Sequence, residues 1–211
     1  MENSLAGLMA AKRNGCRAVE FDVMLTADCL PILMHDETLD RTTRCSGRVA
    51  EMTFAQIRAC DARVPTLGEV IGACERLGLW ANIELKPAAG HEEETGGVVC
   101  RWLARNWNGQ GVISSFSEKS ALAGRQELPA AAFALLCDGL PADWRKQVER
   151  LSAVAVHLDA CQVDAAAVEA LTGVPWAAWT VNDRATAERL FGLGCAAVFT
   201  DHPDLLLPAF A

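Results

Sequence analysis

The chain has 211 residues, of which 51% are hydrophobic and 22% are charged. This length suits one or two domains, and the composition excludes a disordered or collagen-like chain. Nineteen Lys and Arg residues against 27 Asp and Glu residues give a net charge of −8. Because such a surface repels phosphate backbones and anionic headgroups, we expect no nucleic-acid partner and no binding to anionic membranes.

Short apolar runs alternate with helical stretches along almost the whole chain. The expected strands are Ala18–Met24, Leu30–Met34, Trp80–Lys86, Val112–Phe116, Ala132–Cys137, Val154–Leu158, Trp176–Val181 and Ala196–Thr200. The expected helices are Ser4–Asn14, Phe54–Ala59, Leu67–Leu77, Glu92–Asn106, Glu118–Glu127, Pro141–Leu151, Ala165–Leu171 and Arg184–Leu193. Asn3 is expected to cap the first helix, and Asp183 precedes the last. No change in composition divides the chain, so we expect one domain over residues 1–211.

The alternation predicts an α/β fold with a parallel sheet. An open doubly wound sheet and a closed (β/α)8 barrel both fit, and the absence of a Gly-rich nucleotide motif favours the barrel. Only the segment Val23–Cys29 lies between Asp22 on the first expected strand and Leu30, where the second begins. Because a parallel crossover takes about a dozen residues or more, we expect a return without a helix there.

The nine cysteines show no C-x-x-C pair, and several lie in apolar runs. We interpret them as free thiols in a reducing cytosol. No run reaches the roughly 20 apolar residues of a membrane span. The opening residues Met1–Ser4 lack the pattern of a secretory signal, so we expect a cytoplasmic protein without a membrane span.

Two carboxylates stand two residues apart on the first expected strand. Side chains alternate along a strand, so Glu20 and Asp22 project to one side, about 7 Å apart at ~3.3 Å per residue. Such a pair suits a hard divalent cation. A polar, solvent-exposed face is the alternative explanation.

The third expected strand repeats this arrangement, with Asn82, Glu84 and Lys86 on one face. Inside a barrel such residues belong at the carboxyl-terminal mouth, where active sites lie. Glu84 completes an oxygen-ligand set for Mg²⁺ or Ca²⁺ with Glu20 and Asp22. Lys86 offers a compact positive charge to a phosphate oxygen, or forms an ion pair with the carboxylates. His35 follows an apolar run, and at a strand end it can transfer protons near neutral pH.

Taken together, these residues resemble the glycerophosphodiester phosphodiesterase family, of the short cytoplasmic bacterial kind. The matching pieces are Glu2–Leu5, Glu20–Val23, Leu25–Asp28, His35–Thr43, Pro65–Leu67, Ala81–Pro87, Ser114–Phe116, Trp179–Asn182 and Phe199–Asp201. The resemblance implies the TIM-type barrel of the phospholipase C-like phosphodiesterases. It also implies metal-dependent hydrolysis of glycerophosphodiesters, small-molecule substrates of glycerophospholipid breakdown, to glycerol 3-phosphate and an alcohol.

By position, the resemblance assigns roles to individual residues. Glu20, Asp22 and Glu84 match the family's metal ligands, and His35 matches one of its two catalytic histidines. Two further residues match the lining of the substrate pocket. They are Lys86 and Trp179.

The match departs from the family at its start, where a strand ending in His-Arg-Gly and then Pro-Glu-Asn-Thr is usual. Here Met1 stands in place of that proline. We therefore expect this chain to lack the first barrel strand, the other catalytic histidine and an arginine that binds phosphate. A catalytically impaired remnant or a phosphodiester-binding module is the second hypothesis. A barrel lyase with Lys86 as a Schiff-base nucleophile is a third, disfavoured because nearby carboxylates keep the amine charged.

Overall fold

The computed structural model describes residues 1–209. Its strands are β1 (Ala18–Leu25), β2 (Pro31–Leu33), β3 (Trp80–Leu85), β4 (Gly111–Ser115), β5 (Phe133–Cys137), β6 (Ala155–Asp159), β7 (Trp176–Trp179) and β8 (Ala197–Val198). Its helices are α1 (Leu5–Arg13), α2 (Phe54–Cys60), α3 (Leu67–Leu77), α4 (Glu92–Asn106), α5 (Glu118–Glu127), α6 (Trp144–Leu151), α7 (Ala165–Ala170), α8 (Arg184–Gly192) and α9 (Pro203–Leu206). The 3-10 turns are η1 (Val49–Glu51), η2 (Ala160–Gln162) and η3 (Leu207–Ala209). All the expected strands and helices are confirmed with ends shifted by a few residues, while α9 and the 3-10 turns are additions.

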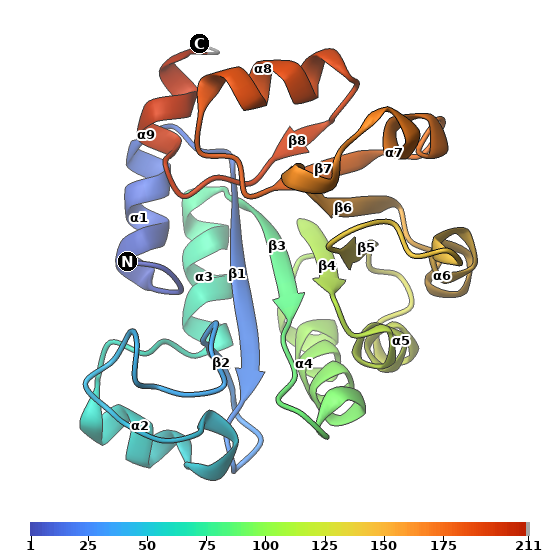
Figure 1. Ribbon diagram of the computed structural model, residues 1–211. Helices are drawn as coiled ribbons and strands as arrows, with labels where there is room; N and C mark the ends of the chain where they lie inside the picture. Colours follow the sequence, from blue (N-terminus) through green and yellow to red (C-terminus); the bar gives the residue numbers. More distant parts are fainter. Residues whose placement is uncertain (210–211) are drawn as a thin grey trace.

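The strands form one curved sheet in the order β2-β1-β3-β4-β5-β6-β7-β8. Strands β1 and β3 to β8 run parallel, each beside the next along the chain. This order is that of a TIM-type (β/α)8 barrel and excludes a doubly wound sheet, in which strand order reverses at a switch point. Within residues 1–209, β8 and β1 are not paired, so the sheet curls without closing (Figure 1). The predicted architecture is confirmed, with β2 as the peripheral strand.

Strand β2 pairs antiparallel with β1, with Val23 opposite Leu33. The connection between them contains no helix, as the short spacing predicts. Because β2 runs back along β1, the residues that follow it return toward the middle of β1. This return carries His35 to the face where Glu20 and Asp22 lie.

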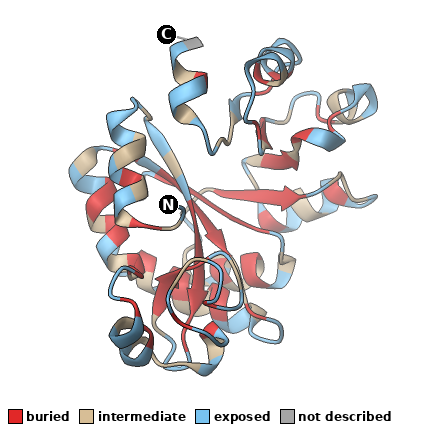
Figure 2. Cartoon of the chain, turned by 60° about the vertical axis from the view of Figure 1, so that its left-hand side comes forward, coloured by how far each residue is buried: buried red, intermediate tan, exposed pale blue. Residues whose placement is uncertain are grey.

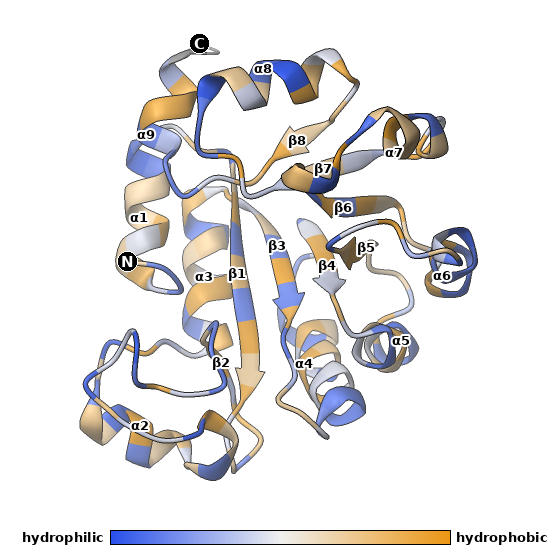
Figure 3. Cartoon of the chain, viewed as in Figure 1, coloured by the Kyte–Doolittle hydropathy of each residue, from blue (hydrophilic) through white to orange (hydrophobic). Residues whose placement is uncertain are grey.

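The two faces of the sheet differ in polarity because side chains alternate along each strand. Toward the helices, Phe21, Val23 and Ile83 join an apolar core shared with α3 and α4. The strands are largely buried in Figure 2, and hydrophilic positions interrupt the apolar colour of β3 in Figure 3. The alternate residues, among them Glu20 and Asp22, face the inside of the curve. No helix within residues 1–209 has the length and apolarity to cross a membrane.

The first helix begins after Ser4 rather than after Asn3. The Ser4 hydroxyl accepts a hydrogen bond from the Gly7 N–H at 3.0 Å, so the prediction of Asn3 as the cap is wrong. Asn3 instead donates from Nδ2 to Asp22 Oδ2 at 2.7 Å and accepts from the Asp22 N–H at 2.9 Å. Pairing with both the side chain and the backbone of Asp22 joins the amino-terminal segment to β1.

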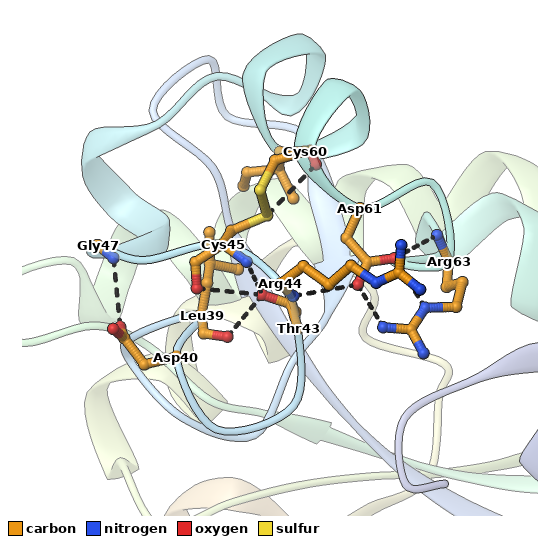
Figure 4. Close-up of a disulfide and its surroundings, with 10 residues drawn as sticks. Leu39, Asp40, Thr43, Arg44, Cys45, Gly47, Cys60, Asp61 and Arg63 are labelled. Carbon is orange, nitrogen blue, oxygen red and sulfur yellow. Dashed lines mark hydrogen bonds and ion pairs between the residues drawn. A yellow bond between two sulfur atoms is a disulfide. The ribbon is translucent and has the colours of Figure 1, made fainter.

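A disulfide joins Cys45 to Cys60, with Cα atoms 5.7 Å apart (Figure 4). The prediction of free thiols is therefore wrong for this pair, and it is confirmed for the other seven cysteines. No sequence motif marks the pair. The two cysteines meet because the segment between β2 and α3 folds back on itself. Beside the disulfide, Asp61 accepts hydrogen bonds from the Arg44 N–H and the Arg63 guanidinium. Covalent and ionic links thus hold the same segment.

Helices α4 and α5 pack with their backbones in contact. A Cβ at Gly96 would lie 1.9 Å from the Ser120 carbonyl oxygen, so only glycine fits there. Gly124 on α5 is equally confined, because its Cβ would lie 2.7 Å from Cys100 Sγ. Gly97, the next residue of α4, meets only the end of a flexible arginine side chain, 4.0 Å away.

We predict that Gly96→Ala destabilises the protein by about 1–3 kcal/mol, because the methyl group forces α4 and α5 apart. The matched variant Gly97→Ala should be more stable than the original by roughly 0.5–1 kcal/mol, since alanine favours a helix interior. Urea unfolding of the three proteins measures both effects. Equal stabilities for the two variants would contradict the packing described.

Candidate active site

Three carboxylates meet on the inner face of the sheet. The register of β1 and β3 places Asp22 opposite Glu84, and Glu20 opposite Asn82. One carboxylate oxygen from each of Glu20, Asp22 and Glu84 lies within 4.8 Å of the others. The structure therefore brings together the three residues that the sequence suggests as ligands of one cation. Their role as ligands stays a prediction.

The crowding of negative charge shifts the pKa of these carboxyl groups. Burial, followed by the nearby charge of Asp22, raises the pKa of Glu84 to about 7. The pKa of Glu20 is raised well above its ordinary value because protein atoms surround the carboxyl group, and Asp22 and Glu84 add repulsion. The Glu20 side chain nonetheless keeps part of its surface open to solvent. The three carboxylates repel one another when all are ionised, and a bound cation would relieve that repulsion.

Lys86 offsets part of the negative charge, and Asn3 stabilises Asp22 through a hydrogen bond. Lys86 Nζ lies 3.2 Å from Asp22 Oδ1 and 3.6 Å from Glu84 Oε1, with a quarter of its side chain exposed. Asn3 Nδ2 donates to the other oxygen of Asp22. Asp22 is thus held from two sides, and the ammonium faces the same space as the carboxylates.

His35 stands at the same end of the sheet, two residues beyond β2. Its Nδ1 lies 2.6 Å from Asp36 Oδ1, and half of its side chain is exposed. The Arg41 guanidinium donates to both oxygens of Asp36 and to both oxygens of Glu2. The hydrogen bonds of Arg41, and then that of His35, hold the pKa of Asp36 well below its usual range. A fixed carboxylate therefore orients one nitrogen of His35 and leaves Nε2 for chemistry.

The sequence assigned no catalytic role to the residues that support the site. They are Glu2, Asn3, Asp36 and Arg41. Glu2 and Asn3 lie in a stretch with no strand or helix pattern, and four residues separate Asp36 from Arg41. Apart from the prediction of Asn3 as a helix cap, their position within the matched motifs was the only signal in the sequence, and it did not indicate which residues they contact.

Trp179 ends β7, and its ring packs edge-on against Phe116 with centroids 5.5 Å apart. Its indole Nε1 is buried and has no hydrogen-bond partner within residues 1–209. On the same face, Asn82 Nδ2 donates to Ser114 Oγ at 3.1 Å, whereas Asn82 Oδ1 is unpartnered in the described chain. One buried donor and one buried acceptor on this face of the sheet therefore lack a partner within residues 1–209.

His157 lies on β6 and packs its ring against Phe199, with centroids 5.1 Å apart. The residue is only 5% exposed, and burial lowers its pKa to about 4. His157 is therefore uncharged near pH 7 and lacks the exposure of His35.

The fold and the acidic cluster define a class: a (β/α)8-type protein whose sheet carries, on its inner face, three carboxylates that could hold a cation. The model of the glycerophosphoryl diester phosphodiesterase family matches residues 1–205. The chain belongs to this family, whose members hydrolyse glycerophosphodiesters.

The chain is similar to named relatives over nearly its full length. A glycerophosphodiester phosphodiesterase of Caldanaerobacter subterraneus subsp. tengcongensis is 30% identical over 98% of this chain and 90% of its own. A phosphodiesterase of Oleispira antarctica, solved in complex with the product sn-glycerol-3-phosphate, is 30% identical and superposes with a TM-score of 0.93. That match covers 99% of this chain and 90% of the Oleispira chain. A glycerophosphodiester phosphodiesterase of Thermotoga maritima, 23% identical, shares the fold with a TM-score of 0.82 over 99% of this chain and 92% of its own.

We predict that His157→Gln flattens the pH dependence of stability between pH 6.5 and pH 4. In the original protein the unfolded state binds a proton at His157 over this range and the folded state does not. Stability contributed by the neutral imidazole is therefore present above pH 6.5 and lost as the pH falls toward 4. Urea unfolding at several pH values measures the difference between the two proteins. Parallel curves for both would contradict the lowered pKa.

Proposed function

We propose that this chain is a metal-dependent enzyme that hydrolyses glycerophosphodiesters to glycerol 3-phosphate and an alcohol. The observation that supports this most directly is the meeting of three carboxylates, Lys86 and His35 at one end of the sheet. The product held by the Oleispira antarctica relative agrees with this substrate class. The expected substrate is a small molecule.

The charges of the site fit a divalent cation. Three carboxylates and one ammonium leave a deficit of positive charge, and a set of oxygen ligands suits Mg²⁺ or Ca²⁺. Glu20, Asp22 and Glu84 would hold the ion. When bound, the cation supplies positive charge that stabilises the negative charge developing around phosphorus.

The chain's own residues supply binding and proton transfer. Lys86 attracts a phosphate oxygen, and Trp179, at the end of β7 on the same face of the sheet, is expected to line the substrate pocket. His35 moves a proton at Nε2 to or from an oxygen of the reacting ester, because Asp36 holds its Nδ1. This assigns His35 as a catalytic residue and Asp36 as a positioning residue.

A phosphodiester-binding module with impaired turnover is the second candidate. Of the histidines in residues 1–209, His35 alone combines exposure with a place at the carboxylate cluster, and acid–base hydrolysis uses a donor and an acceptor. Turnover of glycerophosphocholine with Mg²⁺ or Ca²⁺ separates the candidates: binding without turnover supports the module.

The expected cytoplasmic location stays a prediction, and the Cys45–Cys60 disulfide is more typical of an oxidising compartment.

We predict that Glu84→Gln lowers metal-dependent hydrolysis of glycerophosphocholine by about 10²-fold or more, because it removes one charge from the ligand set. Glu75→Gln, on the exposed face of α3, is the matched control and should leave the rate unchanged. Initial rates across a Mg²⁺ and a Ca²⁺ titration measure the effect. Unchanged metal dependence in Glu84→Gln would remove Glu84 from the ligand set.

We predict that Asp36→Asn lowers kcat by about 10²-fold or more with a smaller change in KM, because an amide orients His35 incorrectly. Glu2 contacts Arg41 and reaches His35 only through Arg41 and Asp36, so Glu2→Gln should lower kcat only a few-fold. Steady-state kinetics on the same substrate give both values. A larger loss in Glu2→Gln than in Asp36→Asn would contradict the proposed order of the network.

A further inference from the structure

The Cys45–Cys60 disulfide joins a buried cysteine to an exposed one. Cys45 is only 4% exposed and belongs to an apolar cluster formed mostly by the segment between β2 and α3, whereas Cys60 is exposed at the end of α2. Thiol–disulfide exchange begins when a thiolate reaches one of the two sulfurs, and Cys60 offers that access. Cys45 Sγ lies 3.8 Å from the Ile57 carbonyl oxygen, so a thiol formed there has an acceptor for its proton. The disulfide can therefore be opened from solvent, and the segment can accommodate the buried cysteine in its reduced form.

A short turn connects Cys45 to Arg41. Thr43 Oγ1 donates to the Leu39 carbonyl oxygen at 2.6 Å and accepts from the Cys45 N–H at 2.9 Å (Figure 4). Arg41 lies within the turn that Thr43 closes in this way. The Arg41 guanidinium donates to both oxygens of Asp36, the carboxylate that orients the imidazole at the acidic cluster. The position of this guanidinium therefore depends on how Cys45 is anchored.

The disulfide is the main link between this turn and α2. Besides it, one long hydrogen bond joins the turn to the residue after the helix, from the Arg44 N–H to Asp61 Oδ2 at 3.3 Å. The turn also has internal hydrogen bonds that do not involve α2, among them the bond from the Leu39 N–H to the Gly47 carbonyl oxygen at 3.0 Å. Opening the disulfide therefore leaves the turn folded and removes its covalent link to the helix.

We propose that the Cys45–Cys60 disulfide is a redox switch: its reduction frees the turn from α2, loosens the hold of Arg41 on Asp36 and lowers the rate of hydrolysis. This inference rests on the proposed function, because the switch acts on the same site. A dithiol reductant supplies the two electrons. One of its thiolates attacks Cys60 Sγ to form a mixed disulfide, and Cys45 leaves as a thiolate that takes up a proton. The second thiolate of the reductant then displaces Cys60, so both cysteines end as thiols and the reductant ends as a disulfide.

Steady-state hydrolysis of glycerophosphocholine with Mg²⁺, by the oxidised chain and by the chain kept in dithiothreitol, tests the switch. We expect kcat to fall about tenfold on reduction with a smaller change in KM, because misplacing an acid–base group slows the reaction more than it weakens binding. The double variant Cys45→Ser with Cys60→Ser should show the lower kcat with and without dithiothreitol. Cys161→Ser, which changes an exposed free cysteine elsewhere, should respond to dithiothreitol as the original chain does.

Equal kcat values for the oxidised and the reduced chain, or a response that persists in the double variant, would overturn the proposal. Alkylation under denaturing conditions, counted by mass, should find seven thiols in the oxidised chain and nine in the reduced chain. A chain that keeps nine thiols in glutathione disulfide lacks the bond, and this result would also overturn the switch.

Hydrogen exchange measured by mass spectrometry separates a failure of the switch from a failure of the proposed function. Reduction should speed the exchange of the Thr43 and Cys45 amides, which are hydrogen-bonded in the turn, and leave the amides of α5 unchanged. If neither form hydrolyses the substrate, faster exchange in the turn still supports a disulfide that controls its position, and the proposed function alone fails. Unchanged exchange on reduction would overturn the switch whatever the rates are.

Discussion

The pairing of β1 with β3 places two carboxylates, Asp22 and Glu84, opposite each other on neighbouring strands. Backbone hydrogen bonds set this register, so the two residues cannot slide apart along the strands without breaking the sheet. Lys86 forms an ion pair with Asp22, and Asn3 donates a hydrogen bond to the same carboxylate. The contact of Asn3 joins the amino-terminal segment to the cluster. The local structure thus follows from a repulsion that the fold maintains and that a cation would relieve.

Much of this arrangement is readable from the sequence because it depends on local periodicity. The alternation along β1 and β3 puts Glu20 and Asp22 on one face and Glu84 on the corresponding face of its partner. The short spacing after Asp22 correctly excludes a parallel crossover, and the alternation of elements correctly indicates an α/β fold with a parallel sheet. These inferences need only neighbours in the chain and the geometry of a strand.

Other features depend on contacts between distant residues, for which the sequence carries no signal. Asn3 is a residue type that often caps helices, yet Ser4 caps α1, and Asn3 forms hydrogen bonds with Asp22 on β1. Cys45 and Cys60 stand in no motif, and the folding of one long segment decides their pairing. Likewise, the link from His35 to Arg41 depends on how a loop without regular structure turns.

The contact between α4 and α5 at Gly96 limits which insertions and deletions this part of the chain tolerates. A helix advances about 100° per residue, so one residue added before Gly96 within α4 would turn the glycine away from Ser120. A side chain would then occupy the contact between α4 and α5. An insertion at Gly109, where a Cβ meets no neighbour, leaves both helices in place. Variation in length is therefore expected at the far end of α4 and not at its start.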